Sequence, residues 1–79
     1  MRNLIAEKSK LKIPLFVVYR HPSDFPDHFV ARLWELNQPT GVYELAETLK
    51  ELQAKLPVEG MLWIKRQPSD DPVILGTWV

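Results

Sequence analysis

A seven-residue stretch that occurs twice constrains the fold of this chain more than any other feature of its sequence. Residues 20–26 and residues 66–72 are identical at five of their seven positions, and each copy lies between two apolar runs. The shared residues are Arg20, Pro22, Ser23, Asp24 and Pro26 in the first copy and Arg66, Pro68, Ser69, Asp70 and Pro72 in the second. We interpret each copy as the loop of a unit made of a strand, a proline-bounded loop and a second strand.

The residues that repeat are those that end strands and build turns. A proline has no backbone N–H, so the hydrogen-bond ladder of a sheet cannot continue through either proline of a copy. Serine and aspartate side chains accept hydrogen bonds from amides a few residues downstream. Because an arginine precedes the aspartate by four residues in both copies, we expect an Arg–Asp ion pair across each loop. The sequence therefore predicts two similar turns in a pseudo-symmetric pair of hairpins.

The apolar runs around the two loops have the composition of strands, rich in β-branched and aromatic residues. The predicted strands are Ile13–Arg20, Phe29–Leu36, Met61–Arg66 and Val73–Val79. The first run is apolar on both of its alternating faces, which is typical of a central strand that is covered on both sides.

The middle of the chain has the pattern of an amphipathic helix. Its leucines recur at helical spacing, at Leu45, Leu49, Leu52 and Leu56. Thr48 and Glu51 fit a capping box, so the helix should begin near Glu47 or Thr48, and Pro57 should end it. Residues 42–46 would then form a third strand after a turn at residues 37–41, whereas the alternative extends the helix back toward residue 41.

These elements predict an α+β domain with a small, mainly antiparallel sheet of four to five strands and one helix on one face. The element order is β-β-(β)-α-β-β. The 79 residues suffice for one domain, in which residues 1–11 form a frayed or weakly ordered tail.

Composition limits the classes of function. Ten acidic and ten basic residues give a net charge of zero, which disfavours nucleic-acid binding, and without cysteine the chain has neither disulfides nor thiolate chemistry. No apolar run has the length of a signal peptide or of a membrane span. We therefore predict a cytoplasmic protein that does not enter the membrane.

The first repeat loop contains the residue types of a catalytic triad or a metal site, but not their spacing. His21, Ser23 and Asp24 are near neighbours on one turn, whereas triad side chains converge from separate segments, and Gln67 replaces His21 in the second copy. Neither Asp27 and His28 nor the Asp70–Asp71 pair completes a recognisable ligand pattern. We predict no catalytic residue, no cofactor and no metal site.

Basic and aromatic residues that lie close together on the predicted strands mark a candidate interaction surface. Its members are Arg32, Trp34, Trp63, Arg66 and Trp78. Sheets that stack unpaired bases use such combinations. Cation–π packing within the sheet is the structural alternative.

The region from Leu15 to Val79 resembles short bacterial and phage proteins of unknown function. The resemblance rests on residues 19–26, on residues 48–52 and on the closing Trp78-Val79. It implies a bacterial or phage cytosolic setting and an accessory role, and it supplies no site residues.

Together these observations predict a non-catalytic cytosolic interaction or accessory domain. It would bind a protein partner or self-associate as a homodimer, through an exposed sheet surface or an edge strand. The alternative is a nucleic-acid-associated protein that uses the sheet face bearing Arg32 and Trp34. A small metal-dependent or hydrolytic enzyme is the third hypothesis.

Overall fold

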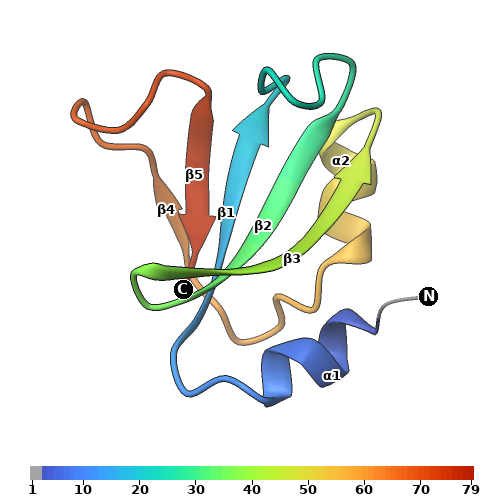
Figure 1. Ribbon diagram of the computed structural model, residues 1–79, viewed down its shortest axis with the longest axis vertical. Coiled ribbons are helices and arrows are strands. Elements are labelled where there is room, and N and C mark those ends of the chain that lie inside the picture. The colour runs from blue at the N-terminus through green and yellow to red at the C-terminus, as the bar shows by residue number, and fades with distance from the viewer. Residues whose placement is uncertain (1–2) are drawn as a thin grey trace.

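The computed structural model describes residues 3–79, which form an antiparallel sheet of five strands accompanied by short helices (Figure 1). In chain order the elements are α1 (Leu4–Ser9), β1 (Pro14–Arg20), β2 (Phe29–Glu35), β3 (Gln38–Ala46), α2 (Leu49–Lys55), β4 (Trp63–Lys65) and β5 (Ile74–Trp78). The strands lie in the order β3-β2-β1-β5-β4. The predicted α+β class is confirmed.

Strand β1 is the centre of the sheet, as its two apolar faces predicted. It pairs with β2 along its whole length, where Val17 lies opposite Arg32, and with β5, where Phe16 lies opposite Trp78. A register shift after Val18 marks a β-bulge in the pairing with β5. The edges of the sheet are β3, which pairs with β2, and β4, which pairs with β5.

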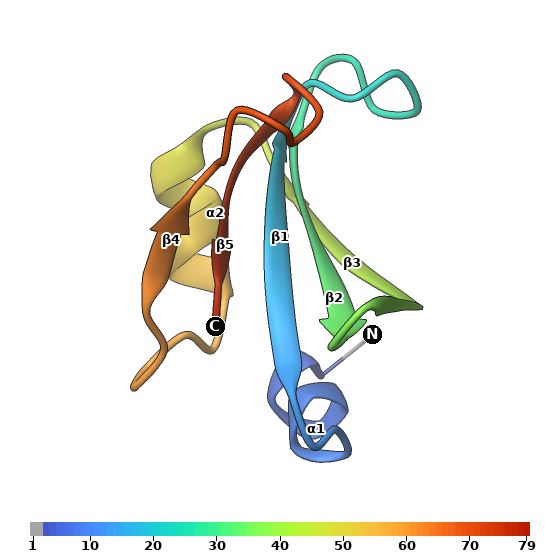
Figure 2. The same ribbon diagram turned by 90° about the vertical axis from the view of Figure 1, so that its left-hand side faces the viewer.

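The core lies between one face of the sheet and the helices. Alternate residues of the central strands point into it, and Leu52 of α2 is completely buried against them. The remaining buried members of this cluster are Leu4, Phe16, Val18, Ala31, Leu33, Ala46 and Leu56. Helix α2 lies behind β2 and β3 in Figure 1, and Figure 2 shows α1 beneath the start of β1. The helices therefore leave the opposite face of the sheet uncovered.

The start of α2 agrees with the predicted capping box. The Thr48 side chain accepts a hydrogen bond from the Glu51 amide at 3.1 Å, which satisfies one of the unpaired amides of the first turn. Residues 42–46 belong to β3, so the alternative helix that begins near residue 41 is wrong.

The turn predicted for residues 37–41 is mostly strand. Strand β3 begins at Gln38, and only Leu36 and Asn37 connect it to β2. Proline fits here because Pro39 lies opposite Trp34, whose backbone bonds to β1, so the missing N–H falls on the outer side of an edge strand. Gly41 adopts a positive φ of 84° within the strand.

Residues 4–9 form helix α1 rather than the frayed tail that the sequence suggested for residues 1–11. The Asn3 side chain caps the helix by accepting from the Ala6 amide, and Leu4 is buried in the core. Lys8 ties the helix to the segment after α2, since its Nζ donates to the Pro57 carbonyl at 2.8 Å. Residues 1–2 lie outside the described part of the chain.

Both repeat loops join neighbouring antiparallel strands. The first connects β1 to β2 and the second connects β4 to β5, and both lie at the same end of the sheet (Figure 1). The final turn is shared, because His28 donates to Phe25 and Ile74 donates to Asp71 at equivalent positions. The first turn is shifted by one residue, since it spans residues 22–25 in one copy and residues 67–70 in the other. The copies are therefore similar but not superimposable hairpins.

The predicted Arg–Asp pair across each loop does not form among the described residues. Asp24 pairs instead with Arg32 of β2, and the Arg20 guanidinium lies 6.0 Å from the centre of the Phe29 ring. Asp70 accepts from the Gln67 backbone amide at 2.8 Å. The aspartate that repeats in sequence thus has an ion-pair role in one loop and a backbone-capping role in the other.

Candidate functional site

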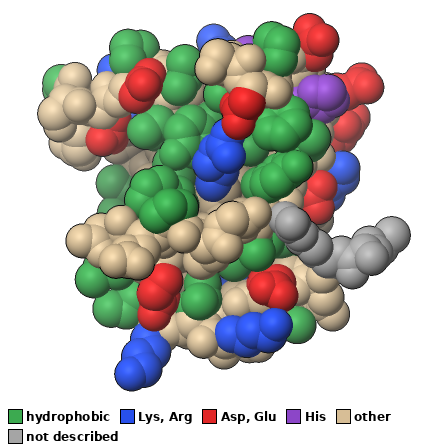
Figure 3. All heavy atoms as spheres, viewed as in Figure 1, with side chains coloured by type: hydrophobic (Ala, Val, Ile, Leu, Met, Phe, Trp, Pro, Cys, Tyr) green, Lys and Arg blue, Asp and Glu red, His purple; other side chains and the backbone are tan. Residues whose placement is uncertain are grey.

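The face of the sheet opposite the helices carries a patch of half-buried, mainly apolar side chains. Because successive side chains of a strand alternate between faces, the neighbours of buried Phe16 and Val18 point to this side. We define the open face as Leu15, Val17, Tyr19, Val30, Arg32, Trp34, Ile74 and Thr77. Figure 3 looks onto this side of the molecule, where hydrophobic side chains gather over the strands.

A shallow hollow of about 280 Å³ lies in the middle of the open face. Val17 and Tyr19 from β1 and Trp34 from β2 form one side, and Ile74 and Thr77 from β5 form the other. Val30 is fully buried beside Tyr19 yet does not belong to the core cluster, so part of this face is already packed. The hollow is the concave part of an apolar surface of the kind that receives a partner side chain.

Arg32 is the basic residue of the open face, and Asp24 holds it in place. Its guanidinium lies 5.3 Å from the centre of the Tyr19 ring, within the range of a cation–π contact. Its Nη2 also donates to an Asp24 carboxylate oxygen, which belongs to the first repeat loop. The ion pair neutralises the charge of Arg32, so the open face presents aromatic and aliphatic surface rather than net positive charge.

Polar groups also line the hollow, namely the side chains of Tyr19, Trp34, Asn37, Asp70 and Thr77. The Trp34 indole Nε1 is buried and has no well-formed hydrogen bond among the described residues. Burial raises the pKa of the Tyr19 phenol above its usual value of 10.0, although the Arg32 charge and the nearby Trp34 lower it in part. The phenol and the indole are both groups with which a partner can hydrogen-bond.

The aromatic surface continues toward β3 and the first loop. The rings of Phe25 and Tyr43 lie 5.2 Å apart, and Tyr43 is 37% exposed on the edge strand. Phe25 stands where the second repeat copy has Asp71, so the two loops present different surfaces at the same end of the sheet.

The predicted interaction residues divide between two faces. Arg32 and Trp34 lie on the open face, whereas Trp78 packs against the core on the helix side and its ring lies 5.3 Å from that of Trp63. Arg66 lies just beyond β4, and its Nε is buried without a hydrogen-bond partner in the described structure. The five residues therefore do not form one surface. Val17, Tyr19 and Ile74 were not predicted as members of this surface, although the alternation of β1 is a signal for Val17 and Tyr19.

The groups considered for catalysis do not converge. The His21 Nδ1 contacts the Pro26 carbonyl at 2.7 Å, and its ring packs edge-on against Phe29, so the imidazole is held within its own turn. Within residues 3–79 no group of three or more histidine, aspartate or glutamate side chains is placed to bind a metal ion.

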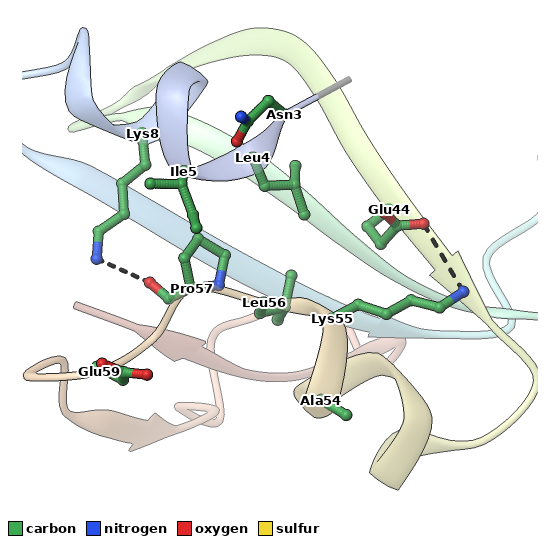
Figure 4. Close-up of a pocket in the computed structure, with 10 residues that line it drawn as sticks. All are labelled: Asn3, Leu4, Ile5, Lys8, Glu44, Ala54, Lys55, Leu56, Pro57 and Glu59. Carbon is green, nitrogen blue, oxygen red and sulfur yellow. Dashed lines mark hydrogen bonds and ion pairs between the residues drawn. The ribbon is translucent and has the colours of Figure 1, made fainter. Parts of the chain in front are cut away.

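A second, larger hollow of about 1180 Å³ lies between α1 and the end of α2 (Figure 4). Leu4, Ile5 and Leu56 supply its apolar floor. Three of its charged side chains are engaged with the chain, because the Lys8 Nζ donates to the Pro57 carbonyl and Lys55 lies 4.0 Å from Glu44. This hollow is a wide groove between packed elements.

Comparisons with known proteins do not extend this description. No protein-family model matches the chain, and neither a curated protein nor a solved structure is similar enough to indicate a relationship. None of the helices within residues 3–79 is long and apolar enough to cross a membrane.

Proposed function

We propose that this chain is a non-catalytic interaction domain of the bacterial or phage cytosol, with an accessory role, and that it binds a protein partner through the open face. The observation that carries the proposal is the apolar hollow on the uncovered side of the sheet. Its mainly aliphatic and aromatic lining favours desolvation by a partner side chain, as in the buried centre of a protein interface.

The polar groups that line the hollow indicate which kind of segment a partner would present to it. The Trp34 indole Nε1 is a buried donor that makes no well-formed hydrogen bond within residues 3–79, although it lies close enough to the Tyr19 phenol to lower the pKa of that group. The Tyr19 phenol is both a donor and an acceptor. Arg32 is already paired with Asp24. These features favour an apolar segment that offers a backbone carbonyl over an acidic one.

Site-specific photo-crosslinking in cells that express the chain tests this proposal. A photoreactive phenylalanine analogue at Val17 would lie in the hollow, whereas the same analogue at Lys50 would lie on the exposed side of α2. We expect a specific adduct from position 17 only. Equal adducts from both positions, or none from position 17, would contradict the proposal.

A second candidate function is the binding of single-stranded nucleic acid. It is favoured by one observation, the presence of Arg32, Tyr19 and Trp34 on the same face of a sheet. Under this alternative, an oligonucleotide at low salt would quench tryptophan fluorescence, and Asp24→Asn would strengthen binding because it releases the Arg32 charge. Absence of quenching in both proteins would eliminate it.

A further inference from the structure

The edge strand β4 exposes backbone groups and large apolar side chains together. Leu62, Trp63 and Ile64 are consecutive and are 71%, 39% and 46% exposed. An apolar edge strand is a template for pairing with another strand unless charge, proline or a cover protects it.

The pairing of β4 with β5 determines which backbone groups point outward. Leu62 exchanges both of its hydrogen bonds with Val79, and the Arg66 amide donates to Leu75. Hydrogen-bonded residues alternate along an antiparallel ladder, so Ile64 also faces β5, while Trp63 and Lys65 face away from the sheet. Within residues 3–79, the amides of Trp63 and Lys65 and the Trp63 carbonyl have no hydrogen-bond partner, and the Lys65 carbonyl has only a long contact of 3.4 Å with Gln67.

From this pattern we infer that β4 pairs antiparallel with β4 of a second copy of the chain, across a two-fold axis at Ile64. In this register Trp63 of each copy lies opposite Lys65 of the other. Opposed residues that both face outward exchange two hydrogen bonds. Each unpaired amide and carbonyl of the edge is therefore used once, and two five-stranded sheets become one continuous sheet.

The side chains favour the same register. Trp63 of one copy and Lys65 of the other would be neighbours on one face, where the ammonium group can contact the indole ring. The two Ile64 side chains would pack against each other on the opposite face. A register centred on Lys65 would instead place two lysines opposite each other, which is destabilising.

The neighbouring residues exclude shifted registers. The Met61 amide already donates to the Val58 carbonyl, and the Gln67 amide donates to the Asp70 carboxylate. Pairings centred on Trp63 or Lys65 would need one of these occupied amides. The edge is thus complementary to itself in one register, which is the reason for choosing a second copy over an unrelated strand.

Cysteine substitution provides a direct test because the chain contains no cysteine of its own. In the inferred register the two Cα atoms of residue 64 would be about 4.5 Å apart, as in other non-hydrogen-bonded antiparallel pairs, which is within disulfide range. We expect Ile64→Cys to oxidise to a disulfide-linked dimer. Ile13→Cys is the matched control, since Ile13 is 48% exposed but lies away from β4, and it should not form this dimer.

Sedimentation of the unmodified chain tests the same pairing without a disulfide. Two short strands bury less than the roughly 1,200 Å² below which interfaces are weak and transient, so the dimer should form only at high micromolar concentration. We expect the mass to rise from 9.2 kDa toward twice that value. Lys65→Pro, which removes an outward amide while leaving the bonds to β5, should abolish the rise.

The outcomes separate this inference from the proposed function. A chain that stays monomeric, a dimer that persists in Lys65→Pro, or equal disulfide formation by Ile64→Cys and Ile13→Cys would overturn edge pairing. Crosslinking from Val17 on the open face would be unaffected by any of these results. The edge pairing can therefore fail while the open-face proposal stands, and the reverse also holds.

Discussion

The two edge strands of this sheet differ in whether their outward backbone groups are hydrogen-bonded. On the outer side of β3, the Leu45 amide donates to the Glu44 carboxylate and the Leu45 carbonyl accepts from the Lys55 ammonium, both at 3.0 Å. Pro39 has no amide to offer, and Gly41 bends the strand at a positive φ. On β4, the outward amides of Trp63 and Lys65 have no such cover within the described residues.

In this sheet the longer edge strand is the better protected one, because its side chains bond the outward backbone groups. In the longer strand, β3, two charged residues, a proline and a glycine hinder pairing with another strand. Charges and proline are common protections of edge strands. The shorter strand, β4, carries a charge at Lys65, but its other exposed side chains are apolar and no side chain bonds its outward amides within residues 3–79. A protein that needed neither edge would be expected to protect both.

The largest effect that we expect comes from adding a methyl group beneath β4. A Cβ at Gly76 would lie 2.4 Å from the Trp63 ring and 2.7 Å from the Ile64 carbonyl oxygen, so Gly76→Ala must push β4 away from β5. We expect a loss of about 3 kcal/mol in the free energy of unfolding, measured with denaturant.

Gly41→Ala is the matched control on the opposite edge. A Cβ there would meet no atom within 4 Å, so only the positive φ opposes it, at a cost of about 1 kcal/mol. Equal losses for the two variants would contradict the close packing of Trp63 on Gly76.

Opening the β3 edge should change association more than stability. The double variant Glu44→Ala/Lys55→Ala uncovers both backbone groups of Leu45, and the partly exposed pair contributes about 0.5 kcal/mol at most. We expect new concentration-dependent association in sedimentation experiments. If the double variant associates no more than the parent chain, these side chains do not protect the edge.

Charging the β4 edge should have the opposite effect. In Ile64→Lys, two lysines would face each other across the inferred two-fold axis, so self-association should disappear. Because Ile64 is half-exposed, the free energy of unfolding should change by less than about 0.5 kcal/mol. Ile13→Lys serves as the control, and it should associate like the parent chain.

The smallest change in stability that we expect concerns Tyr19, which lies on the central strand β1 between the two edges of the sheet. Its pKa is raised in the folded state because burial disfavours the phenolate. The unfolded chain therefore ionises first, so the stability that Tyr19 contributes is fully present below pH 10 and is lost as the pH rises through the folded pKa. Melting temperatures across this range should fall less in Tyr19→Phe. An identical fall in both proteins would exclude Tyr19 as the cause.

Local signals in the sequence predicted most of the fold. The β-branched runs indicated the strands, Thr48 marked the start of α2, and the two apolar faces of β1 indicated a central strand. Helix α1 was missed because six residues carry little periodicity, and Leu4 is buried only through contacts with distant parts of the chain. Residues 37–41 were predicted to form a turn because proline and glycine are common in turns. Both residues also occur in protected edge strands, and composition alone does not distinguish the two.

The site was less predictable because it depends on which strands become neighbours. Arg32 and Trp34 were identified as an interaction pair, but their neighbours Tyr19 and Ile74 come from other strands. Trp63 and Trp78 were assigned to the same surface, whereas the register of β4 and β5 places them on the helix side. The unpaired edge of β4 could not be inferred without the strand order.

Hydrogen exchange at two protein concentrations tests the contrast between the edges most directly. The relevant amides are those of Trp63 and Lys65 on β4 and that of Leu45 on β3, whose Glu44 bond lies within one chain. We expect the amides of Trp63 and Lys65 to exchange rapidly in dilute solution and to become protected at high concentration, while the Leu45 amide exchanges at the same rate in both. Protection of Trp63 and Lys65 that does not depend on concentration would contradict it.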